Sequence, residues 1–120
     1  MGLEACPKDE RLRRRSEFRA VFEGGRRVER SSVVLIWTRG EGSGKAGFTV
    51  SRQVRGSVAR NRARRRLREA YRFSRGLLPP SVHVVLVARG SALENAFSDL
   101  RRDVRDGLQA IAERCRASGA

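Results

Sequence analysis

Arginine is concentrated between residues 52 and 75, where ten arginines stand against a single acid, Glu69. In a helix that begins after Gly56, arginines at every fourth position share one face, and others broaden it. The first group is Arg60, Arg64, Arg68 and Arg72, and the second is Arg62, Arg65 and Arg66. Guanidinium groups bind phosphate oxygens in a bidentate fork, so this stretch favours the binding of a polyanion.

Like charges at helical spacing repel each other, and an isolated helix with this face loses stability. A bound polyanion removes that penalty because its phosphates supply the missing counter-charge. The alternative is a solvated basic face, but such a surface ordinarily mixes acids with its bases. The net charge of +14 also favours nucleic acid. A membrane is the weaker partner, because the chain lacks an apolar run of about 18 residues and a hydrophobic signal segment.

Residues that could perform catalysis are not grouped in this sequence. It contains no nucleophile–base pair, no carboxylate cluster for two metal ions and no glycine-rich phosphate loop. Cys6 and Cys115 lie near opposite ends without a CxxC pair, and the single histidine, His83, lies in an apolar run. We therefore expect no metal site, and two unpaired thiols suit the reducing cytoplasm.

The elements that must position the arginines alternate between helix and strand. Ser16 is expected to cap a short helix with Glu17 in its first turn, and Gly24–Gly25 to end it. The β-branched and aromatic runs predict strands over 32–38, 46–51 and 82–88. The first two strands are expected to pair antiparallel across the glycine-rich turn between them.

Two further helices have apolar stripes that can pack on this sheet. The stripe of the basic helix is Ala59, Ala63, Leu67, Ala70, Tyr71 and Ser74. The stripe of the C-terminal helix is Phe97, Leu100, Val104, Leu108, Ile111 and Cys115. Charges of both signs alternate on the outer face of the C-terminal helix, which is typical of a solvated structural surface. The order of elements predicts one α+β domain over residues 11–116, with flexible tails at 1–10 and 117–120.

The segment GFTVSRQVRGSVARNRARRRLREAYR resembles the signature of the bacterial ribonuclease P protein subunit family. Arg60-Asn61-Arg62 and Leu67-Arg68-Glu69 match that signature directly, and the resemblance covers about residues 11–112. RLRRRSEFRAVFEGGRRV is similar to the family's N-terminal helix with its two phenylalanines, and VHVVLVAR to its last strand. One departure is Gln53, where the family usually has a second basic residue.

The resemblance implies a single-domain α/β sandwich of the ribosomal protein S5 domain 2-like kind. Its small sheet has four mostly antiparallel strands, with three helices and a left-handed βαβ crossover around the Arg-Asn-Arg helix. It also implies a function: members bind a large catalytic RNA, which cleaves the 5′ leader from precursor tRNA with its own Mg²⁺ ions. The protein is expected to bind one RNA, to hold the leader in a cleft beside the N-terminal helix, and to bind no cofactor itself.

Site residues follow from the family's motifs at the matching positions of this chain. The surface that meets the catalytic RNA is predicted to contain Arg60, Asn61, Arg62, Arg64, Arg65, Arg66 and Arg68. The leader cleft is predicted to contain Phe18, Phe22, Trp37, Ser51 and Arg52.

Several of these residues have structural interpretations that the sequence leaves open. Asn61 suits helix capping or turn-holding as well as RNA contact. Two phenylalanines at i and i+4 are by default core residues, and Trp37 carries the same alternative. For the whole chain, the alternatives are a ribosomal-type structural RNA-binding protein, a DNA-binding regulator and a protein-only nuclease. A DNA-binding regulator would need a short helix just before the basic helix, at the spacing of a turn, and the chain has none. A protein-only nuclease would need carboxylates near the basic helix, and these are lacking as well.

Overall fold

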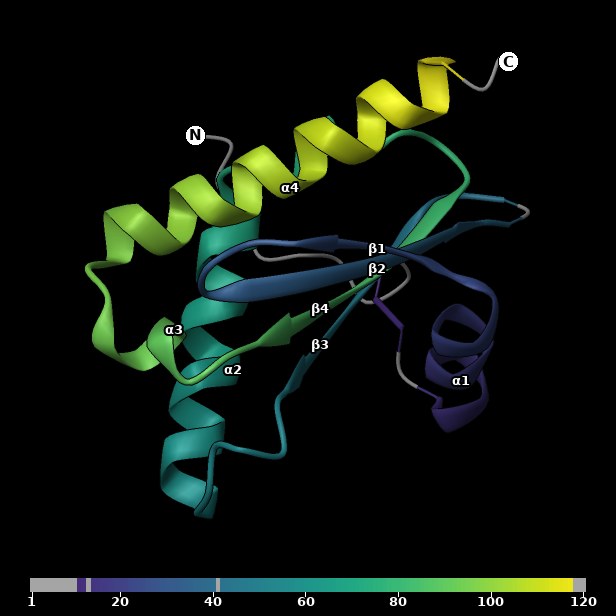
Figure 1. Ribbon diagram of the computed structural model, residues 1–120. Coiled ribbons are helices and arrows are strands. Elements are labelled where there is room, and N and C mark those ends of the chain that lie inside the picture. Colours follow the sequence, from purple (N-terminus) through teal and green to yellow (C-terminus); the bar gives the residue numbers. More distant parts are fainter. Residues whose placement is uncertain (1–10, 13, 41, 118–120) are drawn as a thin grey trace.

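The computed structural model describes residues 11, 12, 14–40 and 42–117, so the predicted tail at 1–10 lies outside the described residues, as does all of the predicted tail at 117–120 except residue 117, which ends α4. Helices and strands alternate along the chain much as predicted (Figure 1). The elements are α1 (Arg15–Gly24), β1 (Arg26–Glu29), β2 (Val33–Arg39), β3 (Lys45–Val50), α2 (Ser57–Arg72), the 3-10 turn η2 (Arg75–Leu77), β4 (Val82–Ala88), α3 (Ser91–Glu94) and α4 (Phe97–Ala117). The short β1 and α3 were not located from the sequence.

The four strands form one mixed sheet in the order β1-β2-β4-β3. β2 pairs antiparallel with β1 and with β4, whereas β3 pairs parallel with β4, Phe48 standing opposite Leu86. The predicted antiparallel pairing of 32–38 with 46–51 is therefore wrong, because β4 lies between them. β4 is apolar on both of its faces, and such a strand is most stable in the middle of a sheet with a neighbour on each side.

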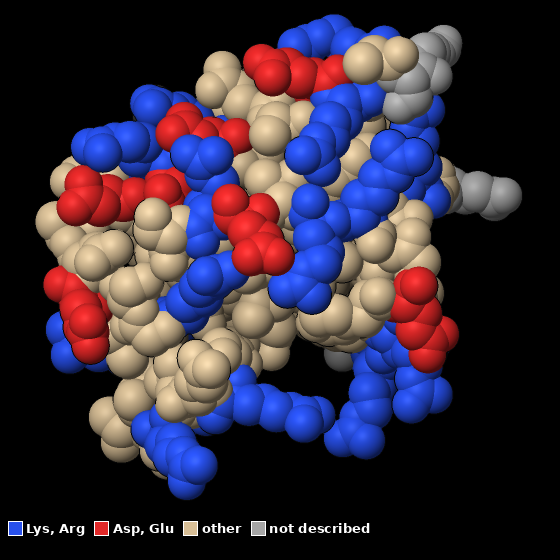
Figure 2. All heavy atoms as spheres, in the orientation of Figure 1, with Lys and Arg blue, Asp and Glu red and all other residues tan. Residues whose placement is uncertain are grey.

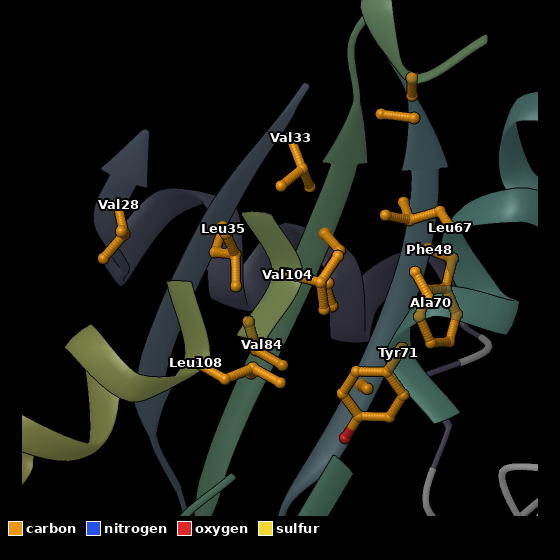
Figure 3. Packing of buried hydrophobic residues seen from close by; sticks show 14 of the residues in the cluster. Val28, Val33, Leu35, Phe48, Leu67, Ala70, Tyr71, Val84, Val104 and Leu108 are labelled. Atoms are coloured by element: carbon orange, nitrogen blue, oxygen red, sulfur yellow. The ribbon is translucent and has the colours of Figure 1, made fainter. Parts of the chain in front are cut away.

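The main core lies between the sheet and the layer of α2 and α4 (Figures 1 and 3). Alternate residues of β2 point into it, among them Val33 and Leu35, and they meet Val104 and Leu108 of α4. Phe48 of β3 packs edge-on against Tyr71 of α2, with ring centroids 5.3 Å apart. A face-to-edge pair adds to the free energy gained by burying both rings.

Most residues of the two predicted helical stripes are buried, but Phe97 is only partly covered, and the partly covered Ser74 lies beyond the end of α2. α2 buries Ala63, Leu67, Ala70 and Tyr71, with Ala59 partly covered, and it begins after Gly56, whose φ is +91°. α4 buries Leu100, Val104, Leu108, Ile111 and Cys115. The arginine-rich face of α2 must therefore point away from the sheet.

α1 lies alone on the opposite face of the sheet (Figure 1). Ser16 is inside its first turn rather than at its cap: Arg14 is the capping residue, and its N–H donates to Glu17 Oε1 at 3.0 Å. The helix ends at Gly24, as the glycine pair predicted. A ten-residue helix cannot cover a four-stranded sheet, and this face remains partly open.

Candidate nucleic-acid interface

The arginines of α2 do not form one uniform surface, because several of them are bound within the protein. Arg60 is partly buried and donates to the carbonyl oxygens of Val50 at 3.1 Å, Ser51 at 2.9 Å and Val54 at 3.0 Å. It thereby fixes the loop that joins β3 to α2. A charged donor shared by three carbonyls is a substantial structural interaction.

Arg66, Arg68 and Arg72 also contact the protein itself. Arg66 donates to the carbonyl oxygens of Ala92 and Asn95, each at 2.8 Å, and so holds α3 against α2. The guanidinium of Arg68 lies 5.9 Å from the centroid of Phe48. Arg72 Nη1 donates to both carboxylate oxygens of Glu69, at 2.8 and 2.9 Å, and this ion pair occupies the one acid of the stretch.

Two arginines of α2 and two of the loop before it are available to a partner. Arg62 and Arg65 are exposed and have no hydrogen-bond or ion-pair partner among the residues that the structure describes. Arg52 and Arg55, in the loop before α2, are exposed in the same way. Figure 2 shows basic side chains along the lower edge of the molecule, where α2 begins. We call Arg52, Arg55, Arg62 and Arg65 the free-arginine surface.

Asn61 does not cap α2, because it lies one full turn inside the helix, and Gly56 is the capping residue. Its side-chain oxygen instead accepts a hydrogen bond from Arg64 Nη1 at 3.1 Å, and the residue is exposed. The capping interpretation of Asn61 is therefore wrong. Asn61 orients Arg64 at the border of the free-arginine surface.

A groove of about 350 Å³ runs along the open face of the sheet beside α1. Its apolar floor comes from β2 and β4, and Phe22 of α1 forms one wall. The lining residues are Phe22, Arg27, Val34, Ile36, Ser51, Gln53, Val87 and Arg89. Figure 2 shows a hollow in this region, below the sheet and bordered by basic side chains. An apolar floor with a cationic rim suits a chain of unpaired nucleotides, whose bases stack and whose phosphates are anionic.

The two phenylalanines of α1 have different environments. Phe22 is 46% exposed and is not a core residue. Phe18 is half-buried and packs on the small cluster of Val21, Val34 and Val85, so the core interpretation holds for Phe18 alone. Its ring lies so close to Gly47 that a Cβ at position 47 would stand 2.7 Å from it.

Trp37 is placed away from this groove, so its assignment to the leader cleft is corrected. It is 3% exposed and belongs to the main core on the α2 and α4 side of the sheet. Successive residues of a strand point to opposite faces, and Ile36 faces the groove, so Trp37 cannot. Ser51 lines the groove, and the exposed Arg52 follows it in the chain.

Arg27 and Arg89 line the groove but were missed from the sequence. Both pair with Glu29, Arg89 at 2.9 Å and Arg27 at 3.7 Å; the side chains of Arg27 and Glu29 are largely exposed and that of Arg89 partly so. Arg27 and Glu29 alternate with the buried Val28 in β1. That alternation is a strand signal, but four residues within a basic stretch are too few to distinguish from a charged loop.

The described residues contain neither a metal site nor a membrane span. No three His, Cys, Asp or Glu side chains in this part of the chain gather closely enough to hold a metal ion. None of its helices is at once long and apolar enough to cross a bilayer. Cys115, the one cysteine described, is buried and unpaired.

The chain matches the family model described as Ribonuclease P over residues 6–112. The chain belongs to the ribonuclease P protein family. It is 37% identical over 108 residues to the ribonuclease P protein component of Geotalea uraniireducens, covering 89% of this chain and 95% of that protein. The component of Mycobacterium bovis is 35% identical over 104 residues, covering 86% of this chain and 90% of its own. The resemblance found in the sequence, and the subunit function that goes with this family, are confirmed.

Solved structures of ribonuclease P proteins share the fold. The protein from Thermotoga maritima superposes with a TM-score of 0.73 at 24% identity, over 84% of this chain and 96% of that one. The protein from Staphylococcus aureus superposes with a TM-score of 0.72 at 17% identity, over 85% and 94%. The predicted α+β class with a small four-stranded sheet is thus confirmed.

Proposed function

We propose that this ribonuclease P protein binds the catalytic RNA through its free-arginine surface and holds the 5′ leader of precursor tRNA in the groove beside α1. The main support for the proposal is that some arginines of α2 are bound within the protein and others are not. Arg60, Arg66 and Arg72 are occupied by carbonyls and by Glu69, whereas Arg62 and Arg65 project without a partner among the described residues. A folded RNA supplies the phosphates that these two guanidinium groups lack.

The groove supports the second half of the proposal. Its exposed phenylalanine offers a stacking face, and its rim offers Arg27 and Arg89, while the exposed Arg52 follows the lining residue Ser51 in the chain. The loop fixed by Arg60 connects the end of β3, which borders the groove, to the start of α2. One RNA-bound protein could therefore hold a leader close to the catalytic RNA.

The chemistry is assigned to the RNA. The described residues bring no three potential metal ligands together, and the proposal leaves the Mg²⁺ ions of the hydrolysis to the RNA. The role of this chain is to bind and to position, with one protein expected for each catalytic RNA. Asn61 and Arg64, which are hydrogen-bonded to each other at the border of the free-arginine surface, would add contacts to the same RNA.

The test is cleavage of precursor tRNA by a bacterial ribonuclease P RNA at low Mg²⁺, with and without this protein. We expect stimulation by the protein, and no cleavage by the protein alone. Tight, salt-sensitive RNA binding without stimulation would instead identify a structural RNA-binding protein and would contradict the leader groove.

A further inference from the structure

A second group of arginines lies where the C-terminal end of α2 meets the start of α4. Phe73 follows α2 and Phe97 begins α4, and their rings pack edge to face with centroids 6.3 Å apart. Each ring carries an arginine: Arg101 lies 3.7 Å from the centroid of Phe73, and Arg66 lies 5.7 Å from that of Phe97. The two arginines thus extend a compact stack between the helices.

The two arginines of this stack differ in what their N–H groups contact. Those of Arg66 are occupied by two backbone carbonyls. Arg101 is exposed and has no hydrogen-bond or ion-pair partner among the described residues. Guanidinium donors lie in the plane of the group, so stacking on Phe73 holds that plane in place and leaves its edge able to donate. A stacked guanidinium is therefore a preorganised fork for an anion.

A hollow of about 250 Å³ adjoins this arginine. We call it the Arg101 niche, and it is lined by Ser74, Ser98, Arg101, Arg102 and Arg105. Three guanidinium groups and two hydroxyls line it, and no carboxylate does. Arg102 contacts Asp99 at 3.3 Å and Arg105 contacts Asp106 at 3.4 Å, both with largely exposed arginine side chains. Exposed pairs of this kind are weak, so an entering anion can compete for both arginines.

We infer that the Arg101 niche binds a phosphate of an RNA backbone and gives the protein a second anchor on its RNA. The partner in this inference is the RNA of the proposed function, on which it rests. Arg62 lies ten residues before the end of α2, about 15 Å along the helix axis, so the two anchors engage different phosphates. The mixed charges on the outer face of α4 had indicated a solvated structural surface. This inference gives the N-terminal end of that face a binding role.

The experiment measures binding of the catalytic RNA by the whole protein over a series of salt concentrations. Arg101→Gln and Arg105→Gln are compared with Arg116→Gln, which removes the same charge from an exposed position at the far end of α4 that has no partner among the described residues. We expect each niche variant to weaken RNA binding roughly tenfold and to reduce the log affinity versus log salt slope by about 0.7–0.9. Arg116→Gln should change both far less. Thermal melting confirms that each variant is folded, and Arg105→Gln leaves the stack on Phe73 intact.

The outcomes separate this inference from the proposed function. If Arg62→Ala weakens binding but the niche variants match Arg116→Gln, the niche is overturned and the proposed function stands. If the unmodified protein does not bind the RNA, both are overturned. Equal losses for Arg101→Gln and Arg105→Gln, beyond that of Arg116→Gln, support the niche.

Discussion

Arg60 Nη2 donates to the carbonyl oxygen of Val50 at 3.1 Å, so an arginine of the basic helix holds the last residue of β3. The same guanidinium holds two carbonyls of the following loop. This contact couples the groove face of the sheet to the start of α2. It also shows that some arginines of α2 stabilise the fold, whereas others are left to bind a partner.

Arg60→Gln should therefore destabilise the protein. A neutral amide cannot reach all three carbonyls, and losing charge-assisted hydrogen bonds in a partly buried site costs about 2–3 kcal/mol. Arg62→Gln, at an exposed site on the same helix, should stay within about 0.5 kcal/mol of the unmodified protein. Urea unfolding of both variants measures the difference, and equal stability would contradict the structural role of Arg60.

Replacing Arg62 and Arg65 together with Ala should weaken RNA binding while the fold survives. Two lost phosphate contacts should lower the log affinity versus log salt slope by about 1.4–1.8. Binding is measured by filter retention over a salt series, and folding by circular dichroism. Unfolding of the double variant would show that these side chains are not on the surface, and an unchanged slope would remove them from the interface.

Phe22→Ala should reduce affinity for leader-bearing tRNA more than for mature tRNA. Loss of one base–aromatic stack costs about 1–3 kcal/mol of binding free energy. Because Phe22 is exposed, the substitution should change the stability of the fold little. Phe18→Ala should instead mainly reduce stability, because its ring lies outside the groove lining and packs on the small cluster with Val21, Val34 and Val85. Holoenzyme affinities for the two tRNAs provide the measurement, and an equal loss for both would rule out the groove as the leader site.

Gly107→Ala should destabilise the core although alanine favours helix. A Cβ at position 107 would lie 2.4 Å from Cδ1 and 2.9 Å from Cδ2 of the fully buried Leu35. Overpacking of this kind costs about 1–3 kcal/mol. Gly24→Ala is the control, because no atom lies within 4 Å of a Cβ at that position, at the end of α1. The melting temperature should fall for the first variant only.

Asp103→Ala should destabilise the contact between α4 and the loop before β2. Asp103 Oδ2 accepts from the backbone N–H of Ser32 at 2.9 Å and from its hydroxyl at 2.5 Å, and Ser32 is fully buried. Removing the carboxylate leaves two buried donors unsatisfied, which costs about 1–3 kcal/mol. Asp99→Ala, on the same helix with only a weak ion pair to Arg102, should cost much less in the same unfolding experiment.

Local patterns were sufficient to locate α1, α2 and α4 and the three strands β2, β3 and β4, but not the short β1 and α3. The stripes from Ala63 to Tyr71 and from Leu100 to Cys115 are buried where their spacing places them. Trp37 was assigned to the wrong face because the sheet's inside and outside depend on where α1 and α4 dock. The pairing of β3 was also missed, since a glycine-rich turn favours a local hairpin, whereas burial of β4 between two neighbours decides the order.

The family, the α+β class and the polyanion-binding character of α2 could be inferred before the fold was known, because they depend on residue types and on spacing along a single element. Which arginines are free depends instead on how the elements pack together. Arg60 and Arg62 are identical in type and two positions apart, yet one holds three carbonyls and the other has no partner in the described part of the chain. The physical reason is that a guanidinium binds whatever acceptors the fold brings within its reach, and those carbonyls come from other elements.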